Sequence, residues 1–194
     1  MSATPGKEVE IKFIVRDIAA LATALRAAGF REKTASTFES NTLYDTAAGE
    51  LRAAGSILRL RVYGERCTLT HKSRGESGRH KSRVEHETQV SNAAEADAIL
   101  RALGYAPAFV YEKFRAEWSD GQGEVVVDRT PIGDLAEIEG APEWIDRTAR
   151  LLGVADADYI TSSYGELFFR WKQQNGSAAR NMTFAECGTP RPEL

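Results

Sequence analysis

The stretch Lys7-Glu8-Val9-Glu10-Ile11-Lys12-Phe13 has the alternation of a β-strand. Successive side chains of a strand project from opposite faces, so Glu8, Glu10 and Lys12 share one face and the apolar residues share the other. The simplest interpretation is a strand at the surface of an antiparallel sheet, with its charges in water. The same mixture of acids and bases on one face returns, however, in most of the later strands.

Six later segments alternate in the same way, at residues 57–62, 66–72, 81–90, 111–118, 124–128 and 135–139, and residues 30–45 form an extended segment with a mixed pattern. Helices are predicted over residues 18–28, 93–103, 144–152 and 164–172, with a short helical turn within 46–54. These helices need an apolar surface, and the apolar strand faces supply it. If the sheet closes, the charged faces line the polar lumen of a barrel.

The predicted lumen face carries charges of both signs. Its acids are Glu8, Glu10, Glu85, Glu87, Asp128, Glu137 and Glu139, and its bases are Lys12, Arg59, Arg61, Lys72, Arg83, Lys113 and Arg115. Confined charges are costly unless they are paired or occupied by ions. Carboxylates suit Mg²⁺ or Mn²⁺, and basic side chains suit a polyanion. The pattern predicts either a metal–polyphosphate site or a network of mutual salt bridges, and chemistry alone favours neither.

Length and charge limit the remaining possibilities. The chain has 194 residues and a formal net charge of −3. We expect one domain over residues 1–174 and a partly disordered tail over 175–194, in which Met182-Thr183-Phe184 could dock. The charge gives no overall attraction to nucleic acid or to a membrane. With no recognisable signal or membrane span, we expect a soluble cytoplasmic monomer or homodimer, with Cys67 and Cys187 as free thiols.

The three histidines do not complete a nucleophilic catalytic arrangement. By parity His71 and His86 point away from the lumen, and His80 lies in the polar loop at residues 73–80. That loop either closes over an anion or is solvated, and the second interpretation is favoured. No phosphate-binding loop of the Walker type is present.

The segment Glu8-Val9-Glu10-Ile11-Lys12 resembles the N-terminal ExExK signature of the CYTH, or triphosphate tunnel metalloenzyme, superfamily, which includes class IV adenylyl cyclases, thiamine triphosphatases and inorganic triphosphatases. The likeness continues in order through Tyr44-Asp45, Leu58-Arg59-Leu60-Arg61, Lys72, Arg83-Val84-Glu85, Lys113-Phe114-Arg115, Asp128 and Glu137-Ile138-Glu139. It covers roughly Lys7 to Lys172. The resemblance implies an α+β fold: an eight-stranded antiparallel closed β-barrel with a charged lumen and helices outside, which binds a triphosphate through its bases and one or two divalent metals through its acids.

The resemblance also implies a role for each lumen residue. The implied metal ligands are Glu8, Glu10, Asp128, Glu137 and Glu139, for Mg²⁺ or Mn²⁺ as cofactor. The implied triphosphate-binding residues are Lys12, Arg59, Arg61, Lys72, Arg83, Lys113 and Arg115, of which Lys12, Arg59, Lys72, Lys113 and Arg115 are the expected catalytic residues. Glu85 is either a further ligand or the partner of a base, and Glu87 is expected to be structural. Tyr44 and Tyr164 either close a tunnel mouth or pack, and packing is favoured.

The reaction implied by the resemblance is metal-assisted phosphoryl or nucleotidyl transfer. Hydrolysis of a phosphoanhydride of inorganic triphosphate, thiamine triphosphate or a nucleoside triphosphate is favoured, because cyclisation also requires an adenine pocket, which the sequence does not reveal. The alternative is a class IV adenylyl cyclase, which converts ATP to cyclic AMP and pyrophosphate, and residues 125–140 resemble the cyclase and thiamine triphosphatase branches. A further alternative is a non-catalytic polyphosphate-binding module. Binding of double-stranded RNA is disfavoured, because the acids would repel phosphates.

Overall fold

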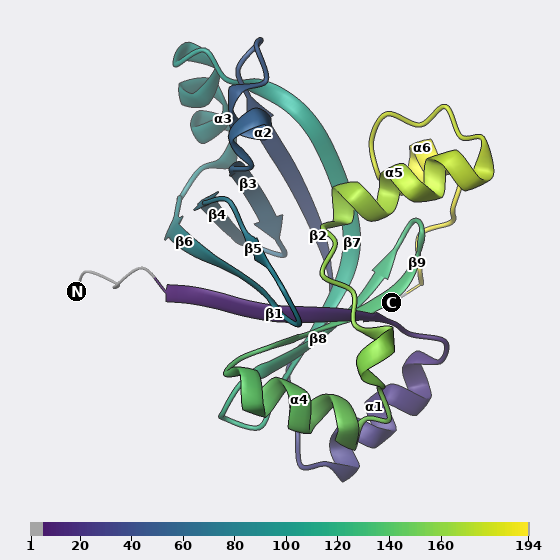
Figure 1. Cartoon of the computed structure of the whole chain (residues 1–194). Helices are drawn as coiled ribbons and strands as arrows, with labels where there is room; N and C mark the ends of the chain where they lie inside the picture. Colours follow the sequence, from purple (N-terminus) through teal and green to yellow (C-terminus); the bar gives the residue numbers. More distant parts are fainter. Residues whose placement is uncertain (1–5, 194) are drawn as a thin grey trace.

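The computed structural model describes residues 6–193 and shows an antiparallel sheet closed into a barrel (Figure 1). Its strands are β1 Gly6–Ile14, β2 Arg31–Asp45, β3 Ile57–Tyr63, β4 Arg66–Lys72, β5 Glu76–Ser77, β6 Lys81–Gln89, β7 Ala106–Ser119, β8 Glu124–Thr130 and β9 Gly133–Glu139. They are ordered β1-β9-β8-β7-β2-β3-β4-β6-β5, and β1 also pairs with β6. Because β5 only extends the edge of β6, eight strands form the closed barrel, as predicted.

The pairing of β1 with both of its neighbours closes the barrel. Glu10 lies opposite Glu139 of β9 on one side and opposite Lys81 of β6 on the other. Glu8 likewise lies opposite Arg83. Directly paired residues of antiparallel strands project from the same face, so this register gathers side chains from distant parts of the sequence in the lumen.

Five of the six helices within residues 6–193 lie where the sequence predicted a helix or a helical turn. The helices are α1 Ile18–Ala27, α2 Glu50–Ala54, α3 Ala93–Ala102, α4 Pro142–Leu151, α5 Tyr164–Asn175 and α6 Phe184–Cys187, with a 3₁₀ turn at Asp156–Asp158, and α6 was not predicted. Asp17 accepts a hydrogen bond from the Ala20 amide at 2.9 Å, and Ser163 forms a reciprocal capping box with Glu166. These contacts satisfy amides that a helix start leaves free. None of the helices in the described part of the chain is long and apolar enough to cross a membrane.

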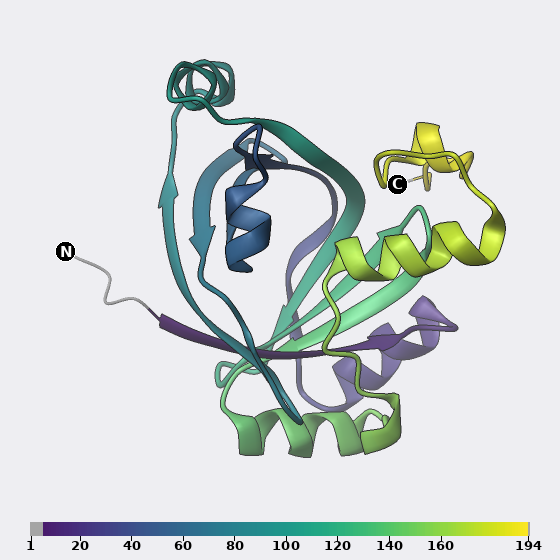
Figure 2. The same cartoon turned by 45° about the horizontal axis from the view of Figure 1, so that its top comes forward.

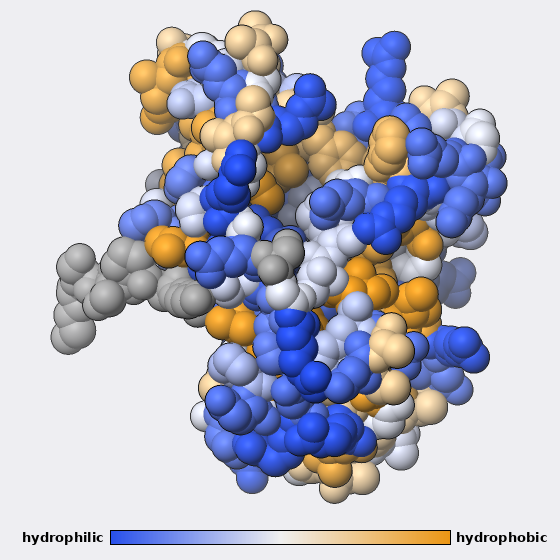
Figure 3. Space-filling model, in the orientation of Figure 1, coloured by the Kyte–Doolittle hydropathy of each residue, from blue (hydrophilic) through white to orange (hydrophobic). Residues whose placement is uncertain are grey.

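The hydrophobic core lies outside the barrel wall, between strands and helices. Helices α1 and α4 lie together on one side of β1 (Figures 1 and 2). There Leu25 and Ile145 pack with Ile11, Val125 and Ile138, all fully buried. The opposite surface of α4 is mainly hydrophilic (Figure 3). Burying the apolar strand faces under helices leaves the charged faces to line the lumen, which agrees with the parity argument.

The segment after α5 is folded onto the barrel, which differs from the expectation of a partly disordered tail. Met182 is fully buried and exchanges backbone hydrogen bonds with Val110 and Glu112 of β7. Strand β8 pairs with β7 only from Phe114 onward, so this part of the β7 edge is open to the tail. The predicted docking of residues 182–184 is confirmed. Residues 1–5 and 194, included in the predicted domain and tail, lie outside the described residues.

Candidate active site

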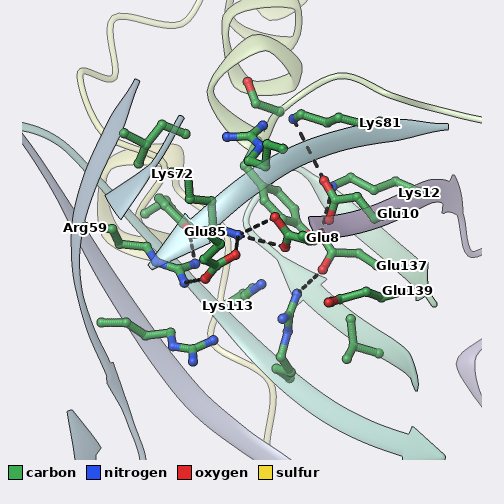
Figure 4. Close-up of a pocket in the computed structure, with 18 of the residues that line it drawn as sticks. Glu8, Glu10, Lys12, Arg59, Lys72, Lys81, Glu85, Lys113, Glu137 and Glu139 are labelled. Atoms are coloured by element: carbon green, nitrogen blue, oxygen red, sulfur yellow. Dashed lines mark hydrogen bonds and ion pairs between the residues drawn. The ribbon is translucent and has the colours of Figure 1, made fainter. Parts of the chain in front are cut away.

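The barrel encloses a cavity of about 350 Å³ whose wall is dominated by charged side chains (Figure 4). The charged residues in the wall are Glu8, Glu10, Lys12, Arg59, Arg61, Lys72, Lys81, Arg83, Glu85, Glu87, Lys113, Arg115, Glu117, Glu124, Glu137 and Glu139. Every residue that the sequence predicted for the site is among them except Asp128. The structure therefore brings the predicted basic and acidic groups together in one cavity.

Four carboxylates gather where β1 meets β9. Glu10 and Glu139 are paired across the two strands, and Glu8 and Glu137 occupy the next inward-facing positions. Desolvation in the cavity wall, followed by the nearby charges of Glu8, Glu137 and Glu10, raises the pKa of Glu139 to about 8, although part of the residue stays exposed to solvent. Such a shift marks negative charge that the neighbouring bases do not compensate.

These four carboxylates fit a divalent cation by their chemistry. Hard oxygen ligands suit Mg²⁺ or Mn²⁺, and a cation would relieve the repulsion that raises the Glu139 pKa. Residues 6–193 do not, however, contain three or more potential ligands already arranged around one point. Binding would therefore require these carboxylates to move together.

Short ion pairs link the bases of β1 and β4 to these acids. Lys12 lies between Glu10, at 2.7 Å, and Glu137, at 3.0 Å. Although burial alone lowers the Lys12 pKa, the two carboxylates outweigh it and hold the pKa above its usual value. Lys72 lies in the same way between Glu8, at 2.8 Å, and Glu85. Lys12 and Lys72 are thus matched by carboxylates until another ion displaces one of the partners.

Asp128 lies behind the cavity wall and is fully buried. Its two oxygens accept hydrogen bonds from Arg115 at 2.7 and 2.6 Å, and Lys113 lies 3.1 Å away. The hydroxyl of Tyr164 donates a further, short hydrogen bond. In this arrangement Asp128 orients Arg115 and Lys113 toward the cavity, and its role as a metal ligand stays a prediction.

Glu39 of β2 belongs to the site but was not singled out from the sequence. It is fully buried, lies opposite Lys113 in the register, and accepts a hydrogen bond from Asn41 at 2.8 Å. Burial alone raises its pKa, but Lys113 and then Arg115 outweigh this effect and lower the pKa to about 2. Polar Ser40 and Thr42 lie between the inward-facing residues, so the alternation that revealed the other strands is weak here.

Lys81 of β6 is a second residue of the site to which the sequence gave no role. It lines the cavity and is 8% exposed. Burial, together with the positive charges of Lys12 and Arg83, lowers its pKa to about 8. The signal in the sequence was its position two residues before Arg83, on the same strand face.

Glu85 and Glu87 of β6 hold the bases of the opposite wall. Glu85 lies 2.7 Å from Lys72, so the structure shows it as the partner of a base. Glu87 accepts a hydrogen bond from Thr70 at 2.7 Å and pairs with Arg61 at 3.2 Å. The arrangement of Glu87 is the one expected of a structural residue.

Tyr44 and Tyr164, which the sequence predicts either to close a tunnel mouth or to pack, lie in different parts of the structure. Tyr44 packs outside the barrel, where its hydroxyl donates to Asp97 of α3. Tyr164, at the start of α5, lines the cavity and stacks on Tyr111 at 5.7 Å between ring centroids. Packing is therefore the observed role of Tyr44, whereas Tyr164 forms part of the cavity wall.

The histidines and the loop at residues 73–80 lie outside the cavity. His71 and His86 face each other on the barrel exterior, with 6.4 Å between ring centroids, as parity predicted. Arg79 pairs with Asp146 of α4 at 3.0 Å, and His80 contacts the same carboxylate at 2.8 Å. Arg79 and His80 are thus engaged by α4, whereas Arg74 donates hydrogen bonds to the carbonyls of Ala53 and Ala54 in α2.

A closed antiparallel barrel with acids and bases facing one another across its lumen is the architecture of a triphosphate tunnel. The family model of the CYTH domain matches residues 6–164, and the chain belongs to this family. Comparison with curated proteins finds no match.

Solved structures of similar fold are known from several organisms. A "putative adenylate cyclase" from Vibrio parahaemolyticus has a TM-score of 0.75 at 21% identity, over 86% of this chain and 99% of that one. A Hippeastrum protein described as a "putative adenylyl cyclase" with a dominant triphosphatase activity has a TM-score of 0.61 at 23% identity, over 84% and 95%. At these identities the likeness shows the shared fold.

Proposed function

We propose that this protein is a divalent-metal-dependent enzyme that hydrolyses a phosphoanhydride of a triphosphate bound in the barrel. The expected substrates are inorganic triphosphate, thiamine triphosphate and nucleoside triphosphates. The observation that carries this proposal is the grouping of charge on the cavity wall: Glu8, Glu10, Glu137 and Glu139 gather on β1 and β9, and all of the bases except Lys12 project from β3, β4, β6 and β7, where Glu85 and Glu87 of β6 accompany them (Figure 4). Such a wall can hold a polyanion between bases and metal-binding carboxylates.

The residues of the chain divide the work by their charge. Glu8, Glu10, Glu137 and Glu139 are the residues that would hold Mg²⁺ or Mn²⁺, which would polarise the phosphoryl oxygens. Arg59 and Arg115 carry forked donors suited to phosphate oxygens, and Lys72 adds a point charge. Neutralising the charge that develops on these oxygens lowers the barrier to phosphoryl transfer.

The observed ion pairs support this division. Arg115 is held by Asp128 and Glu137, each at 2.6 Å, so its guanidinium is oriented before substrate enters. Preorganised cations stabilise a transition state without the cost of reorienting during the reaction. Asp128 and Glu39 would thus serve as positioning residues for Arg115 and Lys113.

Adenylyl cyclisation is the second candidate, and one feature of the cavity favours it. Leu43, Ile57 and Phe109 form an apolar part of the wall, with Phe109 stacked on Tyr111. Apolar and aromatic side chains of this kind can accommodate a purine ring. In a cyclase the ribose 3′-oxygen would attack the α-phosphorus and pyrophosphate would leave.

A product assay separates the candidates. Purified protein is incubated with tripolyphosphate, thiamine triphosphate or ATP, each with Mg²⁺, with Mn²⁺ and with a chelator. Metal-dependent release of orthophosphate supports the triphosphatase, and the fastest substrate identifies its class. Formation of cyclic AMP and pyrophosphate in equal amounts from ATP would contradict the triphosphatase and support the adenylyl cyclase. Tripolyphosphate binding with no product from any substrate would leave a non-catalytic binding module.

A further inference from the structure

The basic side chains of the cavity differ in whether the protein already neutralises them. Eight bases line the cavity, and six of these have a carboxylate oxygen within 2.6 to 3.4 Å. Among residues 6–193, the two bases without such a partner are Lys81 and Arg83. Lys81 has one long contact, 3.9 Å to Glu10, whose oxygen is already bonded to Lys12 at 2.7 Å (Figure 4). The side chain of Arg83 has no ion pair or hydrogen bond within the described part of the chain.

These two residues form one compact feature. They are alternate residues of β6, on the same inward face and about 7 Å apart along the strand. Lys81 is 8% exposed and Arg83 is 9% exposed, and both line the cavity. Buried cations without a partner are costly, so they mark a place that an anion would stabilise.

The surroundings limit what the anion can be. The first turn of α5 borders the same cavity through Ser163, Tyr164 and Gly165, and its Glu166 carboxylate is engaged by the Ser163 amide at 2.6 Å. Lys12 and Arg83 both repel the charge of Lys81, so a metal cation between Lys81 and Arg83 is disfavoured. The feature therefore suits a compact oxyanion that can accept hydrogen bonds from two separate cations.

We propose that Lys81 and Arg83 form an anchoring subsite for the terminal phosphate of the triphosphate, with Lys81 as a substrate-binding residue. This inference rests on the proposed function and goes beyond the residues implied by the family resemblance, which include Arg83 but not Lys81. A terminal phosphate carries a charge of about −1.5 to −2 at neutral pH, as a phosphate monoester does, whereas an internal phosphate carries one negative charge. The two positive charges of Lys81 and Arg83, which have no close carboxylate partner, match the charge of the terminal phosphate. Each of the other six bases must first break an ion pair with a carboxylate before it can bind phosphate.

Isothermal titration calorimetry with two phosphate probes tests the subsite. Linear tripolyphosphate has terminal phosphates, whereas cyclic trimetaphosphate has only internal ones. Titrations in chelator compare wild type, Lys81→Met, Lys81→Arg and the control Lys33→Met, an exposed lysine of β2. We expect Lys81→Met to weaken tripolyphosphate binding at least tenfold and trimetaphosphate binding less than threefold. Lys81→Arg should restore most of the loss, and Lys33→Met should match wild type.

The outcomes distinguish this inference from the proposed function. If wild type binds no tripolyphosphate, with or without metal, the proposed function fails. If wild type binds it and Lys81→Met binds equally well, or loses both probes equally, the subsite is wrong.

A measurement on the wild-type protein covers the case in which Lys81→Met does not fold. Lysine acetylation followed by mass spectrometry should show Lys81 protected when tripolyphosphate is bound, with Lys33 unchanged. Equal modification of Lys81 with and without bound tripolyphosphate would overturn the proposal.

Discussion

Glu139 is a residue whose negative charge destabilises the folded protein when no cation is bound in the cavity. It lines the cavity near Glu8, Glu10 and Glu137; desolvation and then these charges raise its pKa to about 8, and it has no ion pair within residues 6–193. Glu139→Gln should reduce metal-dependent turnover by at least a hundredfold, because it removes a charged ligand. The melting temperature should stay equal or rise, since the substitution removes repulsion. Phosphate release and thermal melts measure both effects.

The control for this prediction is Glu65→Gln, at an exposed loop position. Wild-type turnover in Glu139→Gln would contradict the ligand assignment.

Glu39 makes the opposite contribution, since its charge stabilises the fold. Its pKa is lowered from 4.5 to about 2 in the folded protein. This stability is therefore fully present above pH 4.5 and is lost as the pH falls toward 2. Glu39→Gln should cost roughly 3 kcal/mol at neutral pH and flatten the loss of stability between pH 4.5 and 2. Denaturant unfolding across this pH range provides the measurement. If the free energy of unfolding fell in parallel for wild type and Glu39→Gln between pH 4.5 and 2, other titrating groups would dominate the loss of stability in acid.

The tail beyond α5 shows what one element contributes. Met182 is fully buried among Tyr111, Leu135 and Phe168, so it connects the tail to the barrel. Met182→Ala should cost about 2–5 kcal/mol, the usual range for a buried methionine. Hydrogen exchange should show the loss first in residues 179–187. Phe169→Ala, at a position that is 60% exposed on α5, should change stability by less than about 0.5 kcal/mol. Similar exchange in both variants would mean that the tail does not depend on this contact.

The ion pairs of the whole barrel predict that metal and triphosphate bind cooperatively. Lys72 lies between Glu8, at 2.8 Å, and Glu85, at 2.7 Å, so a cation that takes Glu8 frees positive charge for phosphate. Coupling is reciprocal, since each ligand removes the partner of the other. Tripolyphosphate should bind at least tenfold more tightly with Mn²⁺ than in chelator, after correction for the complex that the two form in solution. Calorimetry provides the test, and equal affinities would show that acids and bases act independently.

The sequence alone determined the features that depend on local geometry. The alternation around Glu10 and Ile11 assigned each residue to a face, because successive side chains of a strand point in opposite directions. Asp17 lies directly before the helix predicted at residues 18–28 and Ser163 directly before the one at 164–172, and their side chains bond amides only three residues away. The resemblance across the charged strands supplied the closed eight-stranded barrel, and all but one of the predicted site residues line its cavity.

Only the tertiary structure decided which charges are matched. Glu39 and Lys113 are 74 positions apart in sequence, and register alone brings them together. Asp128 is satisfied by Arg115 and by Tyr164 of another element, whereas Lys81, with the same strand parity as its neighbours, is left without a close partner. Periodicity assigns a side chain to a face. The partner it meets depends on distances across the barrel, which only strand register and the docking of α5 set.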